Sequence, residues 1–145
     1  MTRFKENGLP SASIEVLPSF HDADPMCVVW HGNYLRFFER AREELFRSIG
    51  YDYRAMTESG YMWPIVHVDI DYRGPMLVET PAIVTARFLE YENRVVVGYE
   101  VRDKASGKVL TRGRTIQMAV DARTHEGQLV SPRILFEKLG VEYPW

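Results

Sequence analysis

The chain has 145 residues, of which 46% are hydrophobic and 26% are charged; this suits one folded domain with a buried core and excludes a disordered or fibrous protein. Eighteen Lys and Arg against 20 Asp and Glu give a net charge of −2, so no overall positive field favours nucleic acid as a partner. A single cysteine excludes an intrachain disulfide, and no apolar run is long enough for a signal sequence or a membrane span, so we expect a cytoplasmic protein.

In chain order, the first residues show no hydrophobic period, and we expect a loose leader over residues 1–12 before a single domain over residues 13–145. A short strand is predicted from Ile14 to Phe20, where apolar residues recur at even spacing. An irregular stretch follows and ends at Asn33, a residue type that favours the N-cap of a helix. The domain is therefore expected to begin with a strand and a loop.

The segment from Tyr34 to Ile49 is predicted to be the one long helix, because its apolar residues cover about half of the helical circumference. Gly50 is placed to end this helix at the C′ position. A helix with so wide an apolar face needs a broad sheet to pack against.

After this helix the hydrophobic period changes from 3.6 to 2, which predicts strands. Short turns join the last three of them as antiparallel hairpins. The predicted strands cover Val66–Tyr72, Ile83–Tyr91, Arg94–Arg102 and Lys108–Val120, and a short terminal helix ends at Leu139. The economical arrangement is an α+β fold in which one antiparallel sheet curls round the central helix.

Residues that can perform chemistry gather in the irregular stretch before the helix, namely His21, Asp22, Asp24 and His31. Such groups near a helix N-terminus can cap or bend the loop, ligate a metal, or act in acid–base or nucleophilic catalysis. Capping suits Asp22, but it suits Asp24 less well because Pro25 removes the nearest N–H donor. The spacing is not typical of a metal site, so we expect no metal.

The defining motifs of several enzyme classes are missing. The sequence has no G-x-S-x-G elbow, no P-loop, no dinucleotide-binding glycine motif and no C-x-x-C, and we expect no cofactor. The lone Cys27 lies between Met26 and Val28, and we interpret it as a small buried hydrophobic residue rather than a nucleophile.

A family resemblance begins at Phe20 and runs to Arg42, over the sequence FHDADPMCVVWHGNYLRFFERAR. This segment strongly resembles the opening motif of the 4-hydroxybenzoyl-CoA thioesterase-like branch of the hotdog-fold superfamily, which includes the acyl-CoA thioesterases associated with the Tol–Pal system. The segment Asp71–Pro75 resembles the family's Tyr-x-x-Pro strand end. With weaker matches toward the C-terminus, the resemblance covers about residues 13–139.

The resemblance implies a hotdog fold, a homodimer or homotetramer whose sheets pair edge to edge with active sites at the interface, and hydrolysis of a thioester carried by CoA or acyl carrier protein. It implies that Asp24 is the catalytic carboxylate, acting as nucleophile or as the base that deprotonates water. His31 matches a histidine of the acyl-CoA branch; it orients substrate or water, protonates the departing thiolate, or only satisfies a loop carbonyl. The backbone N–H of His31 or of Gly32 is implied to polarise the thioester carbonyl.

The chain departs from the family pattern at two aromatic positions. It has Phe20 where many members have Tyr, and Trp30 where Tyr commonly precedes the histidine, which suggests a differently shaped acyl pocket. Phe20, Trp30 and Gly32 are the candidate substrate-binding residues. An apolar or aromatic acyl group is also hinted at by Met56, Met62 and Trp63, although each of these residues equally suits a core.

Two other functions remain open at this point. A hotdog dehydratase or hydratase is disfavoured because its His-Phe-Pro signature is missing. A non-catalytic acyl-binding module is disfavoured because the chain retains Asp24 and His31.

Overall fold

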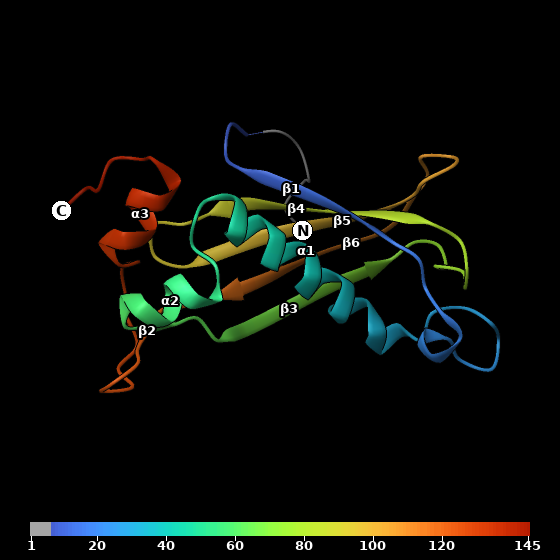
Figure 1. The fold of residues 1–145 in the computed structure, drawn as a ribbon, viewed down its shortest axis with the longest axis horizontal. Coiled ribbons are helices and arrows are strands. Elements are labelled where there is room, and N and C mark those ends of the chain that lie inside the picture. The colour runs from blue at the N-terminus through green and yellow to red at the C-terminus, as the bar shows by residue number, and fades with distance from the viewer. Residues whose placement is uncertain (1–6) are drawn as a thin grey trace.

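The computed structural model describes residues 7–145, and its main feature is an antiparallel sheet that wraps around one long helix (Figure 1). The five strands lie in the order β1-β4-β5-β6-β3, so β1 and β3 form the two edges. Their bounds are Ser11–Val16 for β1, Ile65–Tyr72 for β3, Ala82–Glu90 for β4, Val95–Asp103 for β5 and Val109–Gln117 for β6. The predicted α+β arrangement is confirmed.

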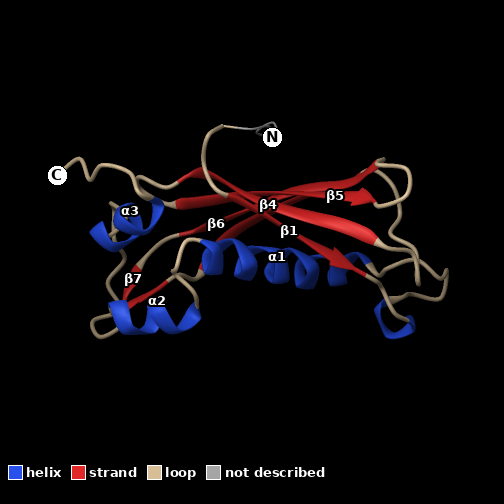
Figure 2. Ribbon diagram, turned by 45° about the horizontal axis from the view of Figure 1, so that its top comes forward, coloured by secondary structure: helices blue, strands red, loops and turns tan. Residues whose placement is uncertain are grey.

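The long helix α1 spans Tyr34–Ser48 and lies across one face of the sheet (Figure 2). It starts at the predicted residue and ends one residue before the predicted Ile49. Gly50 follows with φ of 76°, a left-handed conformation that glycine adopts without strain and that ends the helix.

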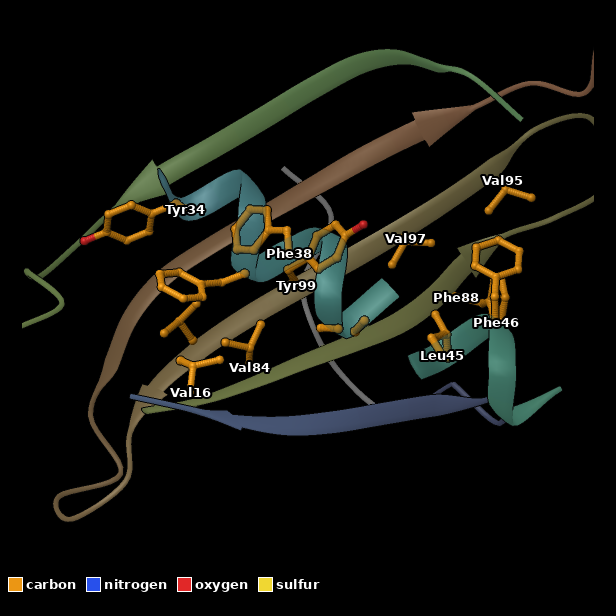
Figure 3. Close-up of a cluster of buried hydrophobic side chains, with 14 of the residues drawn as sticks. Val16, Tyr34, Phe38, Leu45, Phe46, Val84, Phe88, Val95, Val97 and Tyr99 are labelled. Carbon is orange, nitrogen blue, oxygen red and sulfur yellow. The ribbon is translucent and has the colours of Figure 1, made fainter. Parts of the chain in front are cut away.

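The core lies between α1 and the inner face of the sheet (Figure 3). Phe38 stacks on Tyr99 of β5 with ring centroids 4.4 Å apart. Beneath it, a Cβ at Gly113 would lie 2.6 Å from the Phe38 ring and 2.8 Å from the carbonyl oxygen of Asp69. Only glycine at this position lets the helix pack so close to β6.

The N-terminal region differs from the sequence prediction. β1 begins at Ser11, two residues before the expected start of the domain, and the side chain of Asn7 donates a hydrogen bond to the carbonyl of Phe88. Residues 1–6 of the expected leader lie outside the described residues. The prediction that the strand reaches Phe20 is wrong, because this residue lies in the 3₁₀ turn η1 (Phe20–Asp22), where it is 77% exposed.

Several short elements were not predicted. Helix α2 (Tyr53–Ser59) begins at Asp52, whose carboxylate accepts a hydrogen bond from the N–H of Ala55, and it ends at Gly60. The predicted strand Lys108–Val120 is interrupted after Gln117. Its last part, β7 (Val120–Asp121), pairs instead with β2 (Tyr61–Met62).

The C-terminal helix α3 (Arg133–Leu139) confirms the predicted end at Leu139, followed by Gly140 with φ of 70°. Phe136 packs edge-on against Tyr91 at the end of β4, which places α3 over one end of the sheet (Figure 2). Within residues 7–145, no helix combines the length and apolar character needed to cross a membrane.

Candidate active site

The candidate catalytic residue Asp24 occupies the first position of a tight turn. The N–H of Cys27 donates to the carbonyl of Asp24, and the N–H of Asp24 donates to the carbonyl of Val28. Asp at the first position and Pro25 at the second are the residues that a type I turn favours. Cys27 has φ of 64°, which closes the turn in the manner of a hairpin with a bulge.

One oxygen of the Asp24 carboxylate takes part in this turn. Oδ1 accepts a hydrogen bond of 2.8 Å from the N–H of Met26. The expectation that Pro25 weakens a turn-capping role is therefore corrected, because the next N–H along the chain supplies the donor. Cys27 is exposed rather than buried, which corrects its interpretation as a buried hydrophobic residue.

Asp22 anchors the turn region to α1. Its carboxylate is buried and accepts hydrogen bonds from the N–H and the hydroxyl of Ser19 and from Arg36 Nη1 at 2.9 Å. Burial by itself raises the pKa of Asp22, but the hydrogen bonds from Ser19 and the charge of Arg36 outweigh it and leave the pKa below its ordinary value. The carbonyl of Asp22 also accepts from the N–H of Trp30 and from the side chain of Asn33.

A second set of contacts joins the loop to the segment between β3 and β4. The N–H of Val29 donates to the carbonyl of Met76, and Val28 forms a β-bridge with Leu77. The N–H of Met76 in turn donates to the hydroxyl of Tyr34, the first residue of α1. The loop is thus held from both sides, which fixes the position of Asp24 relative to the helix.

The start of α1 offers free backbone donors. A 3₁₀ turn, η2 (His31–Asn33), leads into the helix, and in the described part of the chain neither the N–H of His31 nor that of Gly32 donates a hydrogen bond. Asn33 is the N-cap residue of α1, as predicted, but its side chain makes no capping hydrogen bond. These N–H groups can therefore serve a ligand.

Gly32 has a steric role at this helix start. A Cβ at this position would lie 2.2 Å from the ring of Trp30, so the indole packs directly over Gly32. Two of the candidate substrate-binding residues, Trp30 and Gly32, are thus in direct contact.

His31 is exposed, and its ring lies beside that of Trp30 with centroids 4.9 Å apart. Its carbonyl oxygen accepts a hydrogen bond of 2.7 Å from the hydroxyl of Tyr72, at the end of β3. The Tyr72 ring packs edge-on against Tyr34. Sequence reasoning did not assign a role to either tyrosine; the strand end Tyr-x-x-Pro was the only signal for Tyr72.

The charge of Asp24 affects the pKa of Tyr34. Burial raises the pKa of the Tyr34 hydroxyl, the Met76 N–H opposes this effect, and the Asp24 carboxylate raises the pKa further. The Tyr34 hydroxyl therefore stays neutral at neutral pH.

A large cleft lies toward the other end of α1. Its volume is about 800 Å³, and it lies between α1, α2, β2 and β7, beside the segment Trp63–Pro64 that leads into β3. Its apolar lining includes Phe46, Met56, Met62, Trp63 and Pro64. Three of the five residues that hinted at an acyl pocket thus share one cleft, whereas Phe20 and Trp30 lie outside it.

The α1 residues that line the cleft run from Glu39 to Phe46, about 8 to 18 Å along the helix from Tyr34 at 1.5 Å per residue, so the cleft extends from the middle of α1 toward its end. A metal-binding arrangement is absent from residues 7–145, where no three His, Cys, Asp or Glu side chains converge.

Comparison with known proteins identifies relatives of this arrangement. A model of the thioesterase-like superfamily matches residues 18–136. The Bacillus subtilis (strain 168) protein named "Putative acyl-CoA thioesterase YneP" is 28% identical over 108 residues, which cover 74% of this chain and 78% of that protein.

Solved structures share the fold at lower identity. A 1,4-dihydroxy-2-naphthoyl-CoA thioesterase from Synechocystis superposes with a TM-score of 0.79 at 19% identity, covering 90% of this chain and 96% of that one. A variant of 4-hydroxybenzoyl-CoA thioesterase, complexed with 4-hydroxybenzoyl-CoA, gives 0.78 at 18% identity, covering 90% and 99%. The predicted hotdog fold is confirmed.

Proposed function

The chain belongs to the thioesterase-like superfamily, and from this membership we propose that it hydrolyses acyl-CoA thioesters with Asp24 as the catalytic carboxylate. The observation that carries the proposal is the juxtaposition, in one rigid loop, of a half-buried carboxylate and a helix start with two free N–H groups. The name of the Bacillus relative and the ligand in the 4-hydroxybenzoyl-CoA thioesterase structure support the choice of CoA thioesters.

The chemistry follows from where charge develops. Attack on a thioester carbonyl places negative charge on its oxygen, and a preorganised N–H donor stabilises such an oxyanion by about 2.7 to 4 kcal/mol. The N–H groups of His31 and Gly32 are the available donors. Because Asp24 Oδ1 already accepts from Met26, Oδ2 is the oxygen that faces the reaction.

Two routes use this geometry. In the first, Oδ2 takes a proton from water, the resulting hydroxide bonds to the carbonyl carbon, and the C–S bond breaks to release the CoA thiolate. In the second, Oδ2 itself bonds to the carbonyl carbon, the thiolate leaves, and water hydrolyses the resulting anhydride. In either route the His31 side chain is the candidate donor of a proton to the departing thiolate.

We further propose that the active unit contains two copies of this chain, paired through β3. This strand is an edge of the sheet, and its exposed residues include Ile65, Val66 and Val68, of which Val66 is 55% exposed. An exposed apolar edge strand has unpaired N–H and C=O groups that a second copy can satisfy. A homotetramer would be built from two such dimers.

Pairing of the two β3 strands would also make use of the cleft. An antiparallel pair related by a two-fold axis sets the beginning of one β3 against the end of the other. The cleft reaches Pro64, the residue immediately before β3, and the Tyr72–His31 contact lies at the end of this strand. The cleft of one protomer is thereby brought toward the helix start of its partner, where it would receive the acyl group.

The direct test is thiol release from acetyl-CoA, octanoyl-CoA and 4-hydroxybenzoyl-CoA, and from octanoyl acyl carrier protein as the alternative carrier. We expect at least one acyl-CoA to be hydrolysed by the wild type and not by Asp24→Asn. Use of a CoA substrate would agree with a cytoplasmic location. Equal turnover by wild type and Asp24→Asn would reject the assignment, and binding without turnover would favour the non-catalytic acyl-binding module.

A further inference from the structure

The contact between Tyr72 and His31 joins two segments that are 41 residues apart. The Tyr72 hydroxyl donates to the carbonyl oxygen of His31 at 2.7 Å. Burial raises the pKa of this hydroxyl, and the nearby Tyr34 adds to the effect, so the group remains a proton donor at neutral pH. A strand-end side chain therefore contacts the backbone at the helix start.

The acceptor, the carbonyl of His31, shares its peptide unit with the N–H of Gly32, one of the two proposed oxyanion donors. A peptide is planar and trans, so its C=O and its N–H point in opposite directions, and residues 7–145 contain no cis peptide. The C=O of His31 belongs to the same unit as the N–H of Gly32. Fixing the direction of this carbonyl consequently fixes the direction of the Gly32 N–H.

The 3₁₀ turn η2 (His31–Asn33) also includes this peptide unit, and the remaining contacts act around it. The N–H of Asn33 donates to the carbonyl of Trp30, and the side chain of Asn33 holds the carbonyl of Asp22; both bonds act on neighbouring peptides. Trp30 packs on Gly32 from the side but forms no hydrogen bond with it. Among the side chains of the described residues, the Tyr72 hydroxyl is the one that donates a hydrogen bond to the His31–Gly32 peptide, and it adds to the hold of the 3₁₀ turn.

We propose that Tyr72 is a positioning residue, whose hydroxyl orients the His31–Gly32 peptide so that the Gly32 N–H is aimed at the oxygen of the thioester carbonyl. The inference rests on the proposed thioesterase function. Tyr72 does not touch the substrate in this scheme; it acts through the backbone. The donor it orients is needed most when charge develops on the oxygen, so its effect falls on the chemical step.

The matching test removes only the hydroxyl. Tyr72→Phe keeps the edge-on ring contact with Tyr34 and loses the hydrogen bond to His31. We expect kcat for the best acyl-CoA of the panel to fall about 10- to 100-fold, the range for a misdirected catalytic group, while KM changes by less than about twofold. The control is Tyr91→Phe, which makes the same deletion on a tyrosine that packs against Phe136 at the other end of the sheet.

A second readout does not depend on catalysis. In ligand-free protein, Tyr72→Phe is expected to shift the backbone amide resonance of Gly32 and to speed its hydrogen exchange, with little change in Tm, whereas Tyr91→Phe leaves the Gly32 resonance in place. A normal kcat in Tyr72→Phe, or an unmoved Gly32 resonance, overturns the proposal. If the wild type releases no thiol, the thioesterase proposal fails, and the resonance still decides whether Tyr72 orients the peptide.

Discussion

Arg36 Nη1 lies 2.9 Å from Oδ1 of Asp22, so the first turn of α1 is tied to the loop that carries Asp24. Arg36 is 58% exposed, whereas the Asp22 side chain is only 7% exposed. An exposed ion pair contributes little by itself. The structural value of Asp22 therefore comes mainly from its buried hydrogen bonds with Ser19. Asp24, two residues later, differs, because within residues 7–145 only its Oδ1 accepts a hydrogen bond.

This difference predicts that Asp22→Asn acts on stability. The amide places an N–H₂ where one of the donors from Ser19 or Arg36 now points, and we expect unfolding free energy to fall by about 1–3 kcal/mol. Urea unfolding at pH 7 measures it. Glu58→Gln is the control, because its ion pair with Arg54 is exposed on both sides and should change stability by less than about 0.5 kcal/mol.

The same residue predicts a pH dependence. The pKa of Asp22 is lower in the folded protein than its ordinary value. The stabilisation that it provides is complete above the unfolded pKa and is lost as the pH falls through the folded pKa. The stability gap between wild type and Asp22→Asn should therefore be largest near neutral pH and shrink below about pH 4. A gap that stays constant down to pH 3 would contradict an ionised, paired carboxylate.

Asp24→Asn is expected to lower turnover by at least about 100-fold with the fold intact. The side-chain carbonyl of Asn can still accept the N–H of Met26, so the turn is preserved, but it can neither attack a carbonyl nor take a proton. Asp24→Ala should lose the turn contact as well and unfold at a lower Tm. Steady-state thiol release and thermal unfolding of both variants separate chemistry from folding.

Some structural elements could be predicted from the sequence and others could not, for physical reasons. The start of α1 and the ends at Gly50 and Gly140 follow from local signals, namely hydrophobic period and left-handed glycine. Helix α2 was missed because seven residues are too few to establish a 3.6 period, although Asp52 and Gly60 mark both of its ends. Phe20 fits the period of the strand, yet Asp22 accepts the N–H of Ser19 and folds this segment into a turn instead.

In the candidate site, too, features set by local sequence could be predicted, and features set by packing of distant segments could not. Asp24 was singled out through the family resemblance of its local segment, whereas its capping of the turn was underestimated, because Met26 rather than Pro25 supplies the N–H donor. The Tyr72–His31 bond, and the gathering of Met56, Met62 and Trp63 around one cleft, depend on how distant segments pack. No local pattern encodes such contacts.

His31→Ala tests the side-chain role of the exposed histidine. If the imidazole transfers a proton, turnover should fall by about 10-fold or more. The substitution keeps the backbone N–H. An unchanged rate would assign catalysis to Asp24 and the backbone donors. His125→Ala, in the exposed loop after β7, is the control.

Phe20→Tyr restores the hydroxyl found in relatives at an exposed position. Because the ring is not packed in a strand, Tm should change by less than about 2 °C, consistent with a surface substitution. Turnover should also stay near the wild-type value, because this chain's site is built without that hydroxyl. A several-fold gain in kcat would show instead that a hydroxyl at this position still contributes to catalysis in this chain.

Val68→Lys tests the β3 dimer. A charge on the exposed apolar edge should oppose pairing of two copies, reduce the mass seen by light scattering from about twice the 16.8 kDa chain toward a monomer, and remove most activity. Leu129→Lys makes the same change at an exposed residue in the loop after β7 and should alter neither. A fully active wild-type monomer would contradict the composite site.

Met62→Trp tests whether the cleft holds the acyl group. Met62 lines the cleft and is 45% exposed, so a larger ring there takes up cleft volume without overfilling the core. If the acyl group lies in the cleft, kcat/KM for octanoyl-CoA should fall about 10-fold or more, because each buried methylene contributes about 0.8 kcal/mol. The kcat/KM for acetyl-CoA should stay within about twofold, because its two-carbon acyl group ends near the carbonyl. Leu129→Trp, which adds the same ring outside the cleft, should affect neither substrate. Equal losses for both chain lengths would place the acyl group elsewhere, because a blocked pocket discriminates by length and a general disturbance does not.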